Sequence, residues 1–235
     1  MTSTPTSPSK GKRVILDLCG GTGAWSRPYA EAGYDVKLIT WPDYDVRTYK
    51  LPAEPIYGIL AAPPCTEFSI AKNHKLSRDY KAGMEIVNAC LDIIKKANSV
   101  FWALENPIGM LSKFLGKPAY NFQPWWFGDG WTKRTMLWGK FNKPTRKYLE
   151  YEDCPQLTRA YIRPGRKTVS IAFNHIGQVK YFPQLLPFVG RVKNDAGFRA
   201  ITPPAFASAF YEANHLKEHI CIQCGRQGHS FCNED

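Results

Sequence analysis

The stretch RVILDLCGGTG, residues 13–23, decides the fold class of this chain. Its apolar run over 13–19 is typical of a buried strand, and the glycines that follow it predict a tight loop. The next segment, AWSRPYAEAG (24–33), places Pro28 in the first turn of a short helix and Gly33 at its end. We therefore expect a strand, a glycine-rich loop and a helix, which together open an α/β fold.

The same alternation continues along the chain. Apolar runs predict further strands over 34–40, 56–62 and 100–105. A long helix is expected over 79–98, where Cys90 lies beside the apolar stripe and is expected to be a core residue. Another helix is expected over 201–219, with prolines in its first turn. Strands that alternate with helices predict a mostly parallel sheet covered on both faces.

Three unusual motifs fall where predicted strands end. They are DLCGGTG (17–23), APPC (62–65) and LENP (104–107). Open parallel sheets bind ligands outside the carboxyl ends of their strands. We therefore expect the three motifs to share one site.

Cys65 and Glu105 are the reactive side chains of these motifs. A cysteine is often only a small core residue, and a carboxylate is often only the partner of a Lys or Arg. However, a thiolate can add to C6 of a pyrimidine, and a glutamic acid can supply the hydrogen bond at N3 that this addition needs. The two residues at one edge of a sheet therefore predict pyrimidine chemistry.

The composition favours a polyanionic partner. The chain has 235 residues, 44% of them hydrophobic, and a formal net charge of +11. Segment 133–147 holds six basic residues and segment 159–167 four, with no acidic residue in either. Aromatic residues lie between the charges, a combination that suits phosphate contacts and base stacking. We expect a globular nucleic-acid-binding protein.

Taken together, the motifs resemble those of the DNA cytosine-5 methyltransferase family. DLCGGTGAWS is similar to the family's cofactor loop, PPC to its nucleophile motif, and ENP to its glutamate motif. TKRTMLWG resembles the arginine-bearing strand, and FRAITPPAFASAFYEA the last family segment. The five motifs occur in family order from residue 14 to about residue 214.

This resemblance implies a Rossmann-like, S-adenosylmethionine-dependent methyltransferase fold with a mostly parallel sheet. It implies methylation of C5 of a flipped cytosine in DNA, through a covalent adduct of Cys65. Glu105 would hold N3 and the amino group, and Arg134 would help to hold the base. The residues implied to bind S-adenosylmethionine are Asp17, Cys19, Gly20, Gly21, Gly23, Trp41, Asp45, Val46 and Pro63.

The chain also departs from the family pattern. Cys19 replaces a phenylalanine of the cofactor pocket, and Thr40 lies where an acidic residue usually binds the ribose, with Asp43 as a substitute. The short region 142–196 lies where the family carries a much larger recognition domain. Because sequence readout needs several base-edge contacts, we expect low sequence specificity.

The C-terminal stretch CIQCGRQGHSFC, residues 221–232, is similar to a retroviral-type zinc knuckle. Cys221, Cys224, His229 and Cys232 would bind Zn²⁺ in a tetrahedron, with His215 and His219 as spare ligands. The alternative is a frayed tail. The expected organisation is a disordered tail (1–12), a catalytic domain (13–141), a reduced target-recognition region (142–196), a segment that returns to the catalytic domain (197–219) and the zinc-binding tail (220–235).

Two other functions remain open. The same fold could transfer a different group or act on RNA, or it could be a catalytically idle nucleic-acid-binding protein with an altered cofactor pocket. We expect a monomer that acts on double-stranded DNA with a flipped cytosine, or on single-stranded DNA. No apolar run reaches the roughly 18 residues of a membrane span, so we expect a protein of a bacterial or phage-infected cytosol.

Overall fold

The computed structural model describes residues 13–72, 76–155 and 165–215, which contain one six-stranded sheet. The strands are β1 (Val14–Leu18), β2 (Asp35–Ile39), β3 (Ile56–Ala61), β4 (Phe101–Pro107), β5 (Tyr120–Phe122) and β6 (Thr135–Lys140). The helices are α1 (Arg27–Glu31), α2 (Tyr80–Ala97), α3 (Ser112–Leu115), α4 (Leu186–Val189), α5 (Asp195–Ala200) and α6 (Pro204–Asn214). The short 3₁₀ helices are η1 (Pro124–Trp126), η2 (Tyr151–Asp153), η3 (Ile171–Phe173), η4 (Ile176–Tyr181) and η5 (Pro183–Leu185).

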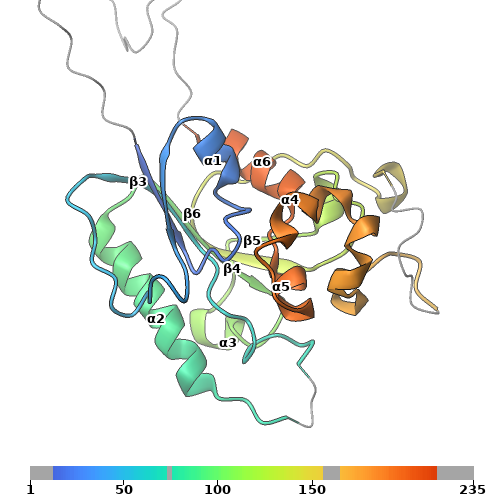
Figure 1. The fold of residues 1–235 in the computed structure, drawn as a ribbon, viewed down its shortest axis with the longest axis horizontal. Helices are drawn as coiled ribbons and strands as arrows, with labels where there is room; N and C mark the ends of the chain where they lie inside the picture. Colours follow the sequence, from blue (N-terminus) through green and yellow to red (C-terminus); the bar gives the residue numbers. More distant parts are fainter. Residues whose placement is uncertain (1–12, 73–75, 156–164, 216–235) are drawn as a thin grey trace, which may run out of the picture.

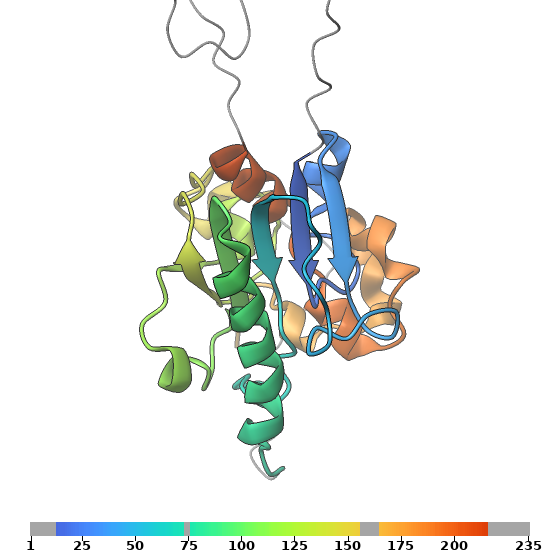
Figure 2. The same ribbon diagram turned by 90° about the vertical axis from the view of Figure 1, so that its left-hand side faces the viewer.

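The strands lie in the order β2-β1-β3-β4-β6-β5. β1 pairs in parallel with β2 and β3, and β3 pairs in parallel with β4. β6 is antiparallel to both β4 and β5. In Figure 2, the yellow-green arrow of β6 points opposite to the arrows of β1, β2 and β3. The sheet is therefore mixed: its three pairs from β2 to β4 are parallel, as expected, and the two pairs that β6 makes are antiparallel.

Each face of the sheet is covered, because successive strand residues point to opposite sides. In β1, Leu16 and Leu18 pack with the buried residues of α2, whereas Ile15 packs with Trp25 and with Phe206 of α6. Figure 1 shows α2 on one side of the sheet and α1 with α6 on the other. The protein therefore has three layers, with the sheet in the middle.

The ends of the helices follow from local signals. Asp79 accepts a hydrogen bond from the backbone N–H of Ala82 and so caps the start of α2. Asn98 ends this helix in the left-handed conformation, at φ 46°. The helix expected over 79–98 is confirmed. The two other predicted helices are shorter in the structure: α1 covers only Arg27–Glu31, and α6 ends at Asn214.

A separate apolar cluster lies beside the sheet. It contains Trp131, Phe182 and Phe198, which are almost completely buried, together with Val169, Ile171, Leu185, Phe188 and Ile201. Short helices from η3 to α5 supply most of it. The predicted domain boundaries at 141/142 and 196/197 stay predictions, and the cluster draws residues from both sides of each.

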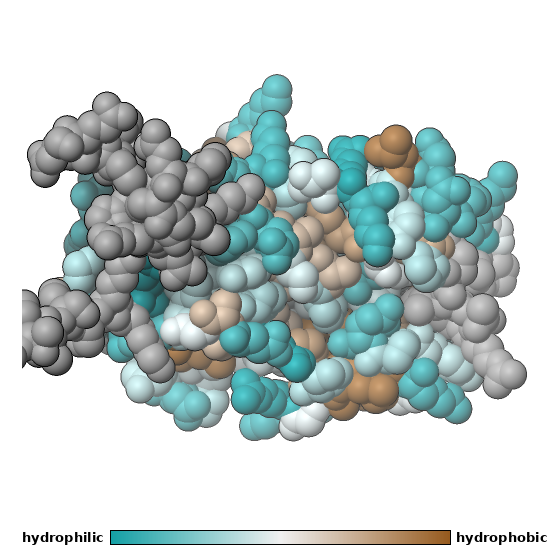
Figure 3. Space-filling model, turned by 90° about the horizontal axis from the view of Figure 1, so that it is seen from above, coloured by the Kyte–Doolittle hydropathy of each residue, from teal (hydrophilic) through white to brown (hydrophobic). Residues whose placement is uncertain are grey.

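The surface is largely hydrophilic where it can be seen. From above the view of Figure 1, hydrophobic residues form small groups among hydrophilic ones (Figure 3). Among the residues described, no helix is both long enough and apolar enough to cross a membrane.

Candidate active site

The chain changes direction across the sheet between β1 and β3. β2 lies on one side of β1, and β3 lies on the other. Such a switch point leaves a crevice at the carboxyl ends of the strands, where ligands bind in open α/β sheets. The glycine-rich loop follows β1 there, and the APPC turn follows β3. The backbone N–H of Ala62 donates to the carbonyl oxygen of Leu18 (2.9 Å), which joins the two loop starts.

Asp17 and Gly20 shape the start of the glycine-rich loop. Asp17 is completely buried and accepts a hydrogen bond from the Ser26 hydroxyl at 2.5 Å. A Cβ at position 20 would lie 2.3 Å from the carboxyl carbon of Asp17, so only glycine fits there. A Cβ at Gly21 would meet nothing within 4 Å, so the space beside the loop is open. Burial raises the pKa of Asp17 to about 7, although its hydrogen bond to Ser26 opposes this.

The side chains after β2 occupy different environments. The Trp41 ring is 75% exposed, whereas Val46 is buried in the core beside α2. The Thr40 hydroxyl accepts a hydrogen bond from the backbone N–H of Gly21 (3.2 Å). Thr40 therefore contacts the glycine-rich loop directly, and Trp41 follows it in the chain.

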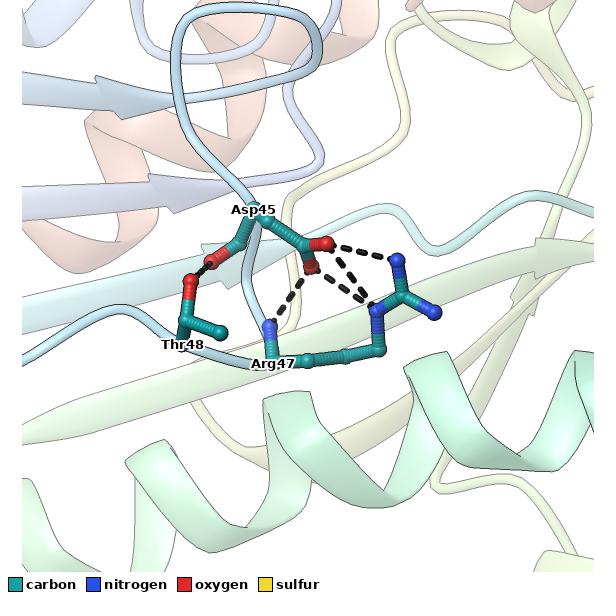
Figure 4. Close-up of polar contacts among 3 residues, drawn as sticks. All are labelled: Asp45, Arg47 and Thr48. Carbon is teal, nitrogen blue, oxygen red and sulfur yellow. Dashed lines mark hydrogen bonds and ion pairs between the residues drawn. The ribbon is translucent and has the colours of Figure 1, made fainter.

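Asp45 is held by a neighbour in its own loop. Its carboxylate accepts three hydrogen bonds from the Arg47 guanidinium, the shortest at 2.6 Å, and one from the Arg47 backbone N–H (Figure 4). These bonds lower the pKa of Asp45 to about 2. A contact between Asp45 and an adenine amino group therefore stays a prediction, and it would compete with this ion pair.

Cys65 lies at the first position of a hydrogen-bonded turn. Its carbonyl oxygen accepts from the backbone N–H groups of Phe68 (3.0 Å) and Ser69 (2.8 Å). The buried Asn106 of the ENP motif donates from Nδ2 to the carbonyl oxygen of Pro63 (3.0 Å). This bond ties the APPC turn to the end of β4 and holds two of the predicted motifs in one arrangement.

Glu105 faces a cation that the sequence did not single out. Lys133 Nζ lies 3.8 Å from Glu105 Oε1, and the two side chains are only 15% and 14% exposed. Burial raises the pKa of Glu105, and the charge of Lys133 opposes this rise. The alternative expectation, an ion pair with a Lys or Arg, is thus met.

The charges of Lys133 and Glu105 also affect the pKa of the Cys65 thiol. Burial raises its pKa, the cation of Lys133 lowers it, the nearby Glu105 raises it, and Arg199 lowers it. The structure therefore brings together Cys65, Glu105, Lys133 and Arg199, at the carboxyl edge of the sheet.

Arg134 and Lys133 are neighbours with different surroundings. Arg134 is exposed, and its carbonyl oxygen accepts from the backbone N–H of Ile108 (2.9 Å). The role expected for Arg134 stays a prediction, because the cation paired with Glu105 is Lys133. The motif TKRT contains both residues, so local sequence could not choose between them. Arg199 lies in the segment FRAITPP, whose resemblance pointed only to the cofactor.

The antiparallel course of β6 divides the first basic segment. Lys133 precedes the strand near Glu105, whereas Lys140 pairs with Trp102, at the opposite end of β4. The Arg146 guanidinium lies over the Trp126 ring, 3.3 Å from its centroid. In the second segment, residues 159–164 lie outside the described part of the chain, and Arg166 and Lys167 are exposed. The basic residues of 133–147 therefore do not share one end of the sheet.

The expected zinc ligands, Cys221, Cys224, His229 and Cys232, lie outside the described residues. Within 13–72, 76–155 and 165–215, no group of three or more His, Cys, Asp or Glu residues is placed to hold a metal ion. The zinc site therefore stays a prediction.

Comparison with known proteins gives a distant structural similarity. No family model matches the chain, and no curated protein matches it. A crystal structure of a candidate DNA modification methyltransferase, encoded within an E. coli prophage, aligns with a TM-score of 0.42 and 17% identity. The alignment covers 68% of this chain and 53% of that protein, so the chain matches about half the length of this neighbour.

Proposed function

We propose that this protein methylates C5 of cytosine in DNA, with S-adenosylmethionine as the methyl donor and Cys65 as a covalent catalyst. One observation carries the proposal: the Asn106–Pro63 hydrogen bond ties the turn that carries Cys65 to the end of β4, where the charge of Glu105 raises the pKa of the Cys65 thiol. The resemblance of five motifs to the cytosine-5 methyltransferases gives the reaction its identity.

The residues around the loop fit S-adenosylmethionine. Space is open beside Gly21, and the exposed Trp41 ring can cover an adenine. Gly20, Gly23 and Pro63 would line the remainder of the pocket. When bound, the cofactor supplies an electrophilic methyl group. The chain's own residues must hold the base, add to it and move its protons.

Cys65 would add to C6 of the flipped cytosine, which makes C5 nucleophilic. Glu105 would donate a hydrogen bond to N3, for which its carboxyl must carry a proton. Its raised pKa favours that protonated form. Transfer of the Cys65 proton to Glu105 produces both reactive forms without a change in net charge. Cys65 and Glu105 together keep a single negative charge, and the neighbouring Lys133 would compensate it.

DNA is the polyanion that best fits the charge and the chemistry. The net charge of +11 favours phosphate, and Lys133, Arg134 and Arg199 lie on segments that reach the site. Low sequence specificity follows from the short region 142–196, which offers few base-edge contacts.

Trapping with 5-fluorocytosine tests this proposal. DNA that carries the analogue should form a denaturation-resistant adduct with the wild-type protein and S-adenosylmethionine, because fluorine cannot leave C5 as a proton does. Cys65→Ser should form none, whereas Cys154→Ser, the same substitution at a buried cysteine that is in no disulfide, should still form it. Adduct formation by Cys65→Ser would contradict the proposal. Mass spectrometry of the modified nucleosides identifies the transferred group and separates DNA from RNA.

A catalytically idle nucleic-acid-binding protein is the second candidate. Two features favour it: Thr40 replaces an acidic residue at the ribose position, and Asp45 is already paired with Arg47. Calorimetry with S-adenosylmethionine decides between the two, since an idle protein binds no cofactor and a methyltransferase must.

A further inference from the structure

Two thiols from distant parts of the chain meet behind the glycine-rich loop. Cys19 directly follows β1, and Cys90 lies in α2, 71 residues later. Their sulfur atoms are 4.0 Å apart, and both cysteines are free. Cys90 is completely buried, whereas Cys19 is partly exposed. An oxidant from solvent would therefore reach Cys19 first.

The backbone holds Cys19 in an unusual conformation. Its φ is +56°, in the left-handed region that favours glycine. The chain nevertheless has cysteine at this position, and its glycines begin one residue later. Its backbone N–H donates to the carbonyl oxygen of Ile39 (2.7 Å), which fixes the start of the loop. A cysteine at this position gains no backbone advantage, but it places a sulfur against α2.

We propose that Cys19 and Cys90 are an oxidation site, whose product is a disulfide that ties the glycine-rich loop to α2. With a hydroperoxide as the oxidant, the Cys19 sulfur attacks the O–O bond and becomes a sulfenic acid, and an alcohol or water leaves. The Cys90 sulfur then attacks the sulfenic sulfur, and its proton leaves with the hydroxyl group as water. Two thiols are thereby oxidised by two electrons, and one hydroperoxide is reduced.

The disulfide requires the loop to move. A disulfide bond is about 2.05 Å long, so the sulfur atoms must approach by about 2 Å. Cys90 cannot supply this movement easily, because it lies in an 18-residue helix whose inner side also buries Val87, Ile93 and Ile94. Cys19 and the glycines after it would shift toward α2. The consequence for the cofactor rests on the proposed function: the oxidised protein should bind S-adenosylmethionine more weakly.

Peptide mapping tests the oxidation site without reference to activity. The full-length protein is treated with a small excess of hydrogen peroxide, its remaining thiols are blocked, and its peptides are mapped by mass spectrometry. A linked Cys19–Cys90 peptide that disappears on reduction is expected from wild-type protein and from Cys154→Ser. Cys90→Ala and Cys19→Ser should give none. Overoxidation of Cys19 while Cys90 stays a free thiol, or a link from Cys19 to a different cysteine, would overturn the proposal.

Calorimetry on the same samples tests the consequence. The reduced protein should bind S-adenosylmethionine at least tenfold more tightly than the oxidised protein, and reduction should restore the affinity. Peroxide-treated Cys90→Ala should lose less than about half of its affinity. Equal affinity in a fully linked sample would refute the effect on the cofactor. If the reduced protein binds no cofactor, the proposed function fails while the linked peptide still establishes the oxidation site.

Discussion

Replacing Asp17 with asparagine should change how the stability of this protein depends on pH. Asp17 is completely buried, and the loss of hydration raises its pKa from 3.8 to about 7. The pKa of Asp17 is higher in the folded protein than in the unfolded chain, so its protonated form stabilises the fold. This contribution to the free energy of unfolding is fully present below about pH 4 and is lost as the pH rises through about 7. Between pH 5 and pH 8, Asp17 alone should lower the free energy of unfolding by about 3 kcal/mol.

Asparagine removes this dependence at little structural cost. Its side-chain oxygen can still accept the Ser26 hydroxyl, but it cannot ionise. Relative to wild type, Asp17→Asn should therefore gain about 3 kcal/mol between pH 5 and pH 8. Asp129 is also completely buried with a pKa of about 7, so the wild-type protein keeps a comparable dependence from that residue.

Urea unfolding at several pH values, followed by tryptophan fluorescence, measures the effect. Asp43→Asn is the control, since Asp43 is exposed and its replacement should leave the wild-type slope unchanged. If the stability profiles of Asp17→Asn and wild type ran parallel from pH 5 to pH 8, Asp17 would not titrate as its burial implies.

Two further predictions concern other side chains. Lys133→Met should raise the pKa of the Cys65 thiol, because it removes a cation beside it, and alkylation of Cys65 at pH 8 should slow by about tenfold for each unit of rise. Lys140→Met at the far end of β6 is the matched control, and equal alkylation of the two variants would contradict the charge effect. Asn98→Ala should lower the free energy of unfolding by about 1 kcal/mol, whereas Asn98→Gly should not, because only glycine adopts the left-handed cap of α2 without strain. Thermal or urea unfolding of both variants gives the comparison, and equal stability would argue against strain at this cap.

Elements whose own residues show a clear hydrophobic or glycine pattern could be predicted from the sequence. The apolar run at β1, its glycines and the amphipathic α2 carry their signals within a few residues. The gathering of the three motifs followed from topology, because parallel strands bring their carboxyl ends to one edge. Hence the sequence alone predicts that Cys65 and Glu105 lie near each other.

The remainder depended on contacts between distant segments. β5 has only three residues, too few for a periodic pattern, and it exists through its pairing with β6. The choice between Lys133 and Arg134 depends on which side chain turns toward β4, and adjacent residues of one sign do not reveal this. Likewise, the meeting of Cys19 with Cys90 depends on how α2 packs on the sheet. The ion pair of Asp45 and Arg47 is local, but charge alone did not separate it from a ligand contact.

The reversed direction of β6 also sets a length scale for any nucleic acid that uses both ends of the strand. Seven residues separate Lys133 near Glu105 from Lys140 beside Trp102. An extended chain of that length spans about 23 Å, which corresponds to about seven base pairs of B-form duplex. Oligonucleotides shorter than this can reach the cation near Cys65 but not the one at the opposite edge. If the protein binds nucleic acid as proposed, the length of β6 therefore sets the shortest footprint that could contact both Lys133 and Lys140.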